Sequence, residues 1–174
     1  MKLLFKLRHM VPTFFMAAFM GWVLPREAAR LASKAQMSQS PDTTFFYSRN
    51  ELYALAEAYG EAGRQAYIES RVRFDILWPL VYGLFFWHLL YVTWPHHRRL
   101  LWLPWLAVAL DLLENSLVSI VFLRFPAATD PAAHVAGFVT AGKWVIITIT
   151  ACLALYGVLR FFVGILQKRS AADV

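Results

Sequence analysis

The most prominent pattern in the chain is a series of long apolar runs separated by short polar turns. These runs lie at about residues 8–24, 76–94, 100–123 and 143–165. A run of roughly 20 apolar residues is long enough for a helix that crosses a membrane. The pattern therefore predicts an all-α integral membrane protein, a four-transmembrane-helix bundle that forms one domain over residues 1–174 and has both termini on one side.

The first run follows the basic residues Lys2, Lys6 and Arg8, and two interpretations fit it. A basic start followed by an apolar stretch is typical of a signal peptide, although residues 33–35 would make a poor cleavage site. Charged residues crowd the chain after Pro25, however. We therefore interpret this run as a retained first span.

A different pattern occupies residues 49–74, between the first two predicted spans. Ser48 and Glu51 have the spacing of a capping box, which marks the start of a helix. Apolar residues then recur every three or four positions among charged ones, as in an amphipathic helix. We expect this extra helix to lie outside the membrane.

The composition agrees with this assignment, because 59% of the residues are hydrophobic, against roughly 45–50% apolar content in soluble domains. The net charge of +6 raises the question of nucleic-acid binding. The basic residues cluster beside apolar runs, however, where they set topology and contact lipid headgroups. We therefore expect membrane lipids as partners and no nucleic acid. Basic N- and C-terminal segments and the basic turn 96–99 predict cytoplasmic termini, in a bacterial inner membrane. The connection between the first two spans is also basic, which weakens this orientation.

The third predicted span carries two acids and an amide, Asp111, Glu114 and Asn115. Ionisable residues inside a membrane are costly and usually face a cavity, a partner or the interior of a bundle. Together with Val118 they fall on one helical face, because positions three and four apart are neighbours. This face is the candidate functional site, with Asp111 and Glu114 as catalytic acid and base and Asn115 as an orienting group.

Three further groups are expected to converge on this face in a bundle, namely Asp75, Tyr82 and Lys143. Two carboxylates one turn apart in a low dielectric repel each other. We expect one of them to hold a proton unless a cation intervenes, and such a pair suits acid/base chemistry. The alternative is a structural network in which Lys143 or Arg64 neutralises the acids.

A second candidate is the segment that contains Tyr59, Gly63 and Tyr67 on one face, with Arg64 beside them. If this segment binds a ligand, Arg64 would bind an anionic headgroup or pair with Glu114 at its side of the pocket. As structural residues, the tyrosines would lie at headgroup depth, as in aromatic belts. We favour the structural interpretation for the tyrosines and leave both open for Arg64.

Metal and cofactor sites are not expected. Cys152 is the only cysteine, which excludes an intramolecular disulfide and a Cys-x-x-Cys redox pair. His88 has no second histidine at similar depth to share a haem, and the adjacent pair His96 and His97 is a poor metal motif. Phosphate-loop and hydrolase motifs do not occur in the sequence.

The outline resembles the superfamily of emopamil-binding proteins and sigma-2 receptors. The similarity rests on the end of the first span at residues 23–27, the segment 59–80, and Asp75 followed by Trp78-Pro79-Leu80. That resemblance implies a lipid-accessible pocket whose acids isomerise sterols or bind amphipathic cations, with Asp75 as the counterpart of the second-span acid. The first span lacks the acid that receptor members carry.

Two functions follow from these patterns. In the first, the acidic pocket binds a lipid- or isoprenoid-like molecule and turns it over by acid/base chemistry. In the second, the chain is a non-catalytic subunit of a larger membrane complex, or of a homo-oligomer, and its acidic face pairs with a partner helix.

Overall fold

The computed structural model describes residues 40–73 and 75–170, together with isolated positions between 14 and 29. The described part of the chain consists of helices joined by short connections and contains no strand, as expected for the all-α class. The predicted first span, near 8–24, lies largely outside the described residues. The elements are η1 (Pro41–Thr43), α2 (Arg49–Arg73), α3 (Leu77–Thr93), η2 (Arg98–Trp102), α4 (Leu103–Arg124) and α5 (Asp130–Ser170).

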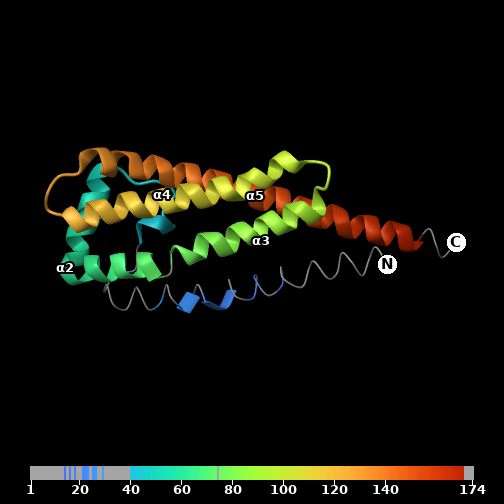
Figure 1. Ribbon diagram of the computed structural model, residues 1–174, viewed down its shortest axis with the longest axis horizontal. Coiled ribbons are helices and arrows are strands. Elements are labelled where there is room, and N and C mark those ends of the chain that lie inside the picture. Colours follow the sequence, from blue (N-terminus) through green and yellow to red (C-terminus); the bar gives the residue numbers. More distant parts are fainter. Residues whose placement is uncertain are drawn as a thin grey trace.

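The capping box predicted at the start of α2 is present. The Glu51 carboxylate accepts hydrogen bonds from the amide and the hydroxyl of Ser48, both at 2.7 Å, and the Glu51 amide donates to the Ser48 hydroxyl at 3.3 Å. The helix is not continuous, however. Gly60 has φ 62° and ψ 178°, a conformation that only glycine adopts without strain. Figure 1 shows α2 turning a corner, so that its second part runs toward the start of α3.

The three remaining helices, α3, α4 and α5, run along the long axis of the molecule (Figure 1). Residues Arg98–Arg124 and Asp130–Gly164 are long and apolar enough to cross a membrane. The helix α3 has 17 residues; it meets the same criterion only together with α2, from which it is bent by 42°. The described part of this membrane protein thus holds two candidate spans, or three if the bent pair is one broken span.

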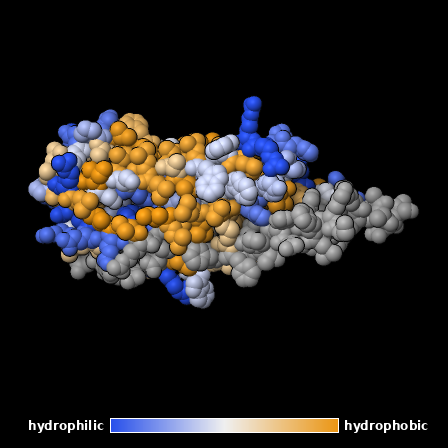
Figure 2. All heavy atoms as spheres, viewed as in Figure 1, coloured by the Kyte–Doolittle hydropathy of each residue, from blue (hydrophilic) through white to orange (hydrophobic). Residues whose placement is uncertain are grey.

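The last helix extends beyond the predicted span at both ends. We expected a span over residues 143–165, whereas α5 begins at Asp130 and continues for 41 residues. One face of its first turns is buried, because Ala133 and Ala136 are fully buried in the main core cluster. Farther along, large apolar side chains such as Leu155 and Leu159 are exposed. Figure 2 shows apolar residues as a band between hydrophilic groups at one end of the molecule and others near the α3–α4 turn, as in a protein surrounded by lipid.

The amphipathic helix α2 packs into the bundle instead of lying apart from it. Tyr59 is 6% exposed and Tyr67 1% exposed, and both rings pack on Phe122 of α4, with centroids 5.4 and 4.7 Å apart. The aromatic-belt interpretation of these tyrosines is therefore wrong. Their apolar face serves helix packing, because the corner at Gly60 lets both parts of α2 reach α4 and α5.

A close contact fixes the segment before α2 against α5. A Cβ atom at Gly137 would lie 1.9 Å from the backbone oxygen of Tyr47. Only glycine allows the two backbones to approach so closely at this point. The contact places the buried Tyr47 ring beside α5, where it reaches the site described next.

Candidate functional site

The site is built on the buried face of α4. Buried residues recur along this helix every three or four positions, the spacing of a helix that packs on one face. The polar residues Asp111, Glu114 and Asn115 lie in the middle of this stripe, and Val118 follows them. The sequence-based prediction that these side chains share an inward face is therefore correct.

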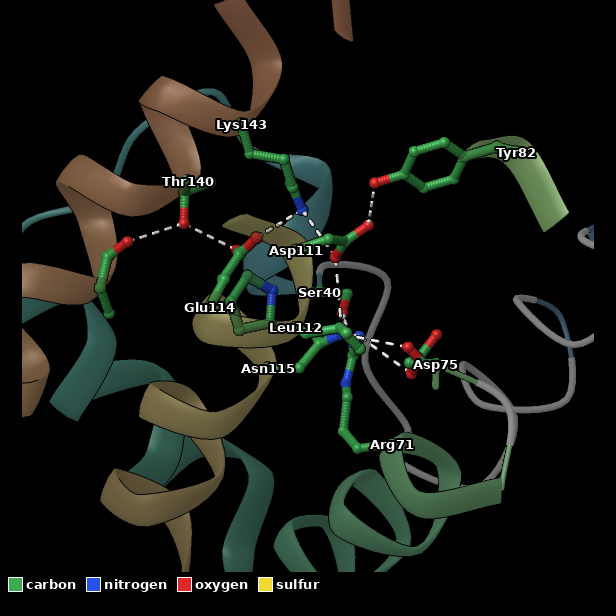
Figure 3. Close-up of polar contacts among 12 residues, drawn as sticks. Ser40, Arg71, Asp75, Tyr82, Asp111, Leu112, Glu114, Asn115, Thr140 and Lys143 are labelled. Atoms are coloured by element: carbon green, nitrogen blue, oxygen red, sulfur yellow. Dashed lines mark hydrogen bonds and ion pairs between the residues drawn. The ribbon is translucent and has the colours of Figure 1, made fainter. Parts of the chain in front are cut away.

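The central contact is made by a lysine from α5. The Lys143 ammonium forms an ion pair with Glu114 Oε2 and lies 3.5 Å from Asp111 Oδ1. Figure 3 shows Lys143 reaching between the two carboxylates. Asp111 is 7% exposed and Glu114 1% exposed. Lys143 of α5 is thus the cation that would allow both Asp111 and Glu114 to be ionised, as expected.

Each carboxylate also has its own hydroxyl donor. Tyr82 of α3 donates to Asp111 Oδ2 at 2.9 Å, and Thr140 of α5 donates to Glu114 Oε1 at 2.7 Å. The Thr140 and Tyr47 hydroxyls lie 3.1 Å apart. A chain of polar contacts therefore runs from Tyr82 through the two acids and Lys143 to Tyr47, and the two carboxylates have different surroundings.

A second branch joins the cluster through Arg71, near the end of α2. Its Nη1 donates to the Asp75 carboxylate at 2.9 Å and to Asn115 Oδ1 at 3.1 Å, and its Nη2 donates to the Ser40 hydroxyl at 3.2 Å. Asn115 in turn donates to Asp111 Oδ1 at 3.5 Å. Figure 3 shows this branch on the side of the cluster away from Thr140. Residues from α2, α3, α4 and α5 thus meet at one place.

Of the predicted site residues, six belong to this cluster: Asp75, Tyr82, Asp111, Glu114, Asn115 and Lys143. The structure places Arg64 elsewhere. Its Nη1 donates to the Ala56 carbonyl at 2.8 Å and its guanidinium lies over the Phe125 ring. It lies near the corner of α2, packed on the first part of α2 and the end of α4.

Tyr59 and Tyr67 lie in the aromatic core with Phe122. Tyr67 also contacts the network through Arg71, whose guanidinium lies 4.1 Å from the Tyr67 ring centroid. We therefore assign both tyrosines to packing, with Tyr67 supporting Arg71.

The sequence reasoning missed Arg71 and Thr140. Arg71 lies in a charged stretch that suggests a solvent-exposed helix end, yet it is 5% exposed. Its position four residues before Asp75 was an available signal, because such pairs face each other on a helix. Thr140 likewise precedes Lys143 by one turn on the same face of α5.

A groove of about 360 Å³ lies at the start of α2, and neither the two acids nor Lys143 are among its lining residues. Its walls come from the segment before α2 and from the first turns of α2, and include Phe46, Leu52 and Leu55. Two of its residues, Ser40 and Tyr47, also contact the cluster, through Arg71 and Thr140 respectively. The groove is thus apolar along most of its length and polar where it meets the network.

Comparison of the chain with family models, curated proteins and solved structures gave no match. Two carboxylates with one ammonium between them can exchange a proton, and their different hydroxyl partners distinguish one from the other. Within the described residues, no group of three or more His, Cys, Asp or Glu side chains is arranged to hold a metal ion.

Proposed function

We propose that this protein binds a lipid- or isoprenoid-like amphiphile, with the polar head of that molecule at the buried cluster of Asp111, Glu114 and Lys143. The observation that carries the proposal is that one buried ammonium contacts two buried carboxylates between apolar helices. Ionisable groups at such a position usually mark a ligand or proton site. When all three groups are ionised the trio is negative, so a proton or a cationic head would neutralise it.

The groove supports an amphiphile as the ligand. Its apolar walls suit a hydrocarbon chain, while Ser40 and Tyr47 give a polar head two contacts that lead into the cluster. Ligand sites commonly combine apolar walls with a few convergent polar groups.

Acid/base turnover of such a ligand needs both carboxyl groups. In a double-bond isomerisation, one carboxylic acid would protonate a carbon of the double bond, and the other carboxylate would remove a proton from a neighbouring carbon. The substrate and product then have the same atoms, and the proton has moved from one carboxyl to the other. Lys143 would stabilise whichever carboxylate is ionised.

This function agrees with what the resemblance to the emopamil-binding-protein and sigma-2 receptor superfamily implies, and we retain that kinship as part of the proposal. Asp75, the counterpart of the family's acid, joins the cluster through Arg71. We also propose the four-span topology, with the first span near residues 8–24. A bacterial inner membrane as the location and cytoplasmic termini belong to the same proposal. The subunit interpretation gains no support, since Asp111 and Glu114 are buried against a lysine of their own chain.

The test is the lipid that stays with the purified protein. The variants Asp111→Asn and Glu114→Gln keep the shape of each side chain and remove its charge. After purification in a mild detergent, the bound lipids are extracted and identified by mass spectrometry. We expect one species enriched with the wild-type protein and lost from both variants.

The matched control is Ser116→Ala, an exposed position on the same helix whose hydroxyl bonds only to the Leu112 carbonyl of its own helix in the described structure. This variant should keep the bound species. Circular dichroism and the melting temperature show whether the acid variants remain folded. Folded acid variants that retain the full amount of the bound species would overturn the proposal.

A further inference from the structure

The end of the bundle that holds the α3–α4 turn carries basic groups without acidic ones. Residues 76–110 and 131–170 contain no Asp or Glu. Arg98 and Arg160 are both exposed there. Among residues 40–73 and 75–170, neither arginine forms an ion pair.

Both arginines are held on aromatic rings. The Arg98 guanidinium lies over Tyr91, 5.1 Å from the ring centroid, and Tyr91 stacks on Trp87 with ring planes 16° apart. The Arg160 guanidinium lies over Trp94, 5.2 Å from the centroid. Such stacking uses the face of the guanidinium and leaves its N–H edge for an acceptor.

The Trp94 platform is itself fixed in position. Its indole N–H donates to the Leu153 carbonyl at 3.1 Å, and its ring packs against Tyr156 and His97. A Cβ atom at Gly157 would lie 2.7 Å from the indole nitrogen. The helix α5 therefore needs glycine at this point, where the Thr93 and Trp94 side chains approach its backbone.

Tyr91 is in the last turn of α3 and Trp94 is its C-cap residue, so both residues lie at this end of the helix. We propose that Arg98 and Arg160, on these two rings, form a binding site for the phosphodiester headgroup of an anionic membrane lipid. The planar edge of a guanidinium matches the paired oxygens of a phosphate. The exposed apolar side chains Leu155 and Leu159 continue from the site along α5 and would accompany the acyl chains.

This site is separate from the buried acidic cluster, so its test does not depend on the function proposed above. The purified protein in detergent is titrated with phosphatidylglycerol or with phosphatidylcholine, and bound lipid is counted by native mass spectrometry. We expect tighter binding of phosphatidylglycerol. The variant Arg98→Gln/Arg160→Gln should weaken phosphatidylglycerol binding by about fivefold for each arginine removed, or about 25-fold in all, and leave phosphatidylcholine unaffected.

Two matched variants make the test specific. Arg49→Gln/Arg124→Gln removes the same charge at the opposite end, where Arg49 pairs with Asp130, and should leave lipid preference unchanged. Arg98→Lys/Arg160→Lys keeps the charge but not the planar fork, and should weaken phosphatidylglycerol binding. Circular dichroism confirms that each variant is folded.

Three results would overturn the proposal. The first is equal binding of the two lipids by the wild-type protein. The second is full phosphatidylglycerol affinity in the glutamine or the lysine variant, which would make the two guanidinium groups irrelevant. The third is displacement of phosphatidylglycerol by inorganic phosphate at equal concentration, which would mean that the site takes free phosphate instead of a lipid.

Discussion

Lys143 of α5 and Glu114 of α4 form an ion pair whose side chains are 4% and 1% exposed. Burying two charges carries a large desolvation cost, which their mutual attraction offsets only when the contacts are good. Here Thr140 adds a hydrogen bond to the carboxylate. The pair therefore ties α4 to α5, and its loss should destabilise the packing of the bundle.

Replacing Lys143 with methionine should reduce the free energy of unfolding by about 3–5 kcal/mol, because two carboxylates then remain buried without their cation. Unfolding in mixed micelles, followed by circular dichroism, measures the change. Thr148→Ala, an exposed change on the same helix, should have little effect. A loss below about 1 kcal/mol for Lys143→Met, the size expected of a surface pair, would contradict the buried contact.

A second change should partly rescue the first. In the double variant Lys143→Met/Glu114→Gln, a neutral amide replaces the carboxylate that pairs with Lys143 in the wild type. Less buried charge is therefore left without a partner. Removing both partners of a buried pair costs less than removing one. A double-mutant cycle should therefore give a favourable coupling of about 0.5–3 kcal/mol. Additive losses would mean that the two residues act independently.

Gly137→Ala should destabilise the protein by about 1–3 kcal/mol or more, since the new methyl group meets the Tyr47 backbone at 1.9 Å. Backbone atoms cannot move aside as a flexible side chain can. Gly142→Ala on the same helix is the matched control, because its nearest neighbour would lie at an ordinary 3.9 Å. Gly142→Ala should leave the stability unchanged or raise it, because alanine has a higher helix propensity than glycine. Equal melting temperatures for the two variants would show that α5 is not held against this segment.

Gly60→Ala should cost about 1–3 kcal/mol of stability, because alanine does not adopt the backbone conformation found at this corner. The added methyl group would meet no neighbour within 4 Å, so the loss would come from the backbone alone. Gly164→Ala, which is equally uncrowded and lies inside a regular helix, should not destabilise the protein. If Gly60→Ala were the more stable variant, α2 would be a straight helix.

The capping box predicts one effect of pH. Hydrogen bonds from the backbone amide and the hydroxyl of Ser48 lower the pKa of Glu51 from its usual value of 4.5. The charge therefore stabilises the folded chain above the unfolded pKa, and this contribution is lost as the pH falls through the lower, folded pKa. Glu51→Gln should melt below the wild type at neutral pH, and the difference should disappear in acid. A difference that does not change with pH would contradict the pairing.

Much of the cluster could be predicted because its signals are local. Asp111, Glu114 and Asn115 are conspicuous in an apolar run, and helical spacing alone places them on one face. Lys143 stood out for the same reason, since a charge between apolar segments needs a partner. The meeting of Asp111, Glu114 and Lys143 follows from packing α4 on α5.

Arg71 and the path of α2 could not be predicted in the same way. Arg71 is buried only because α2 turns at Gly60 and returns along the bundle, and the backbone angles at one glycine cannot be read from its neighbours. Without that turn, Tyr59 and Tyr67 look like residues at the membrane surface. With it, they pack on Phe122 and become part of the core.

The most direct test of the central claim is an experimental structure of the protein purified with its native lipids. The account predicts density for an amphiphile in the groove beside Leu52 and Leu55, with its polar head within hydrogen-bond distance of Ser40, Tyr47 or the Asp111–Glu114–Lys143 cluster. A groove and a cluster that contain no density other than protein, with Lys143 still between the two acids, would contradict it and leave the cluster with a structural role.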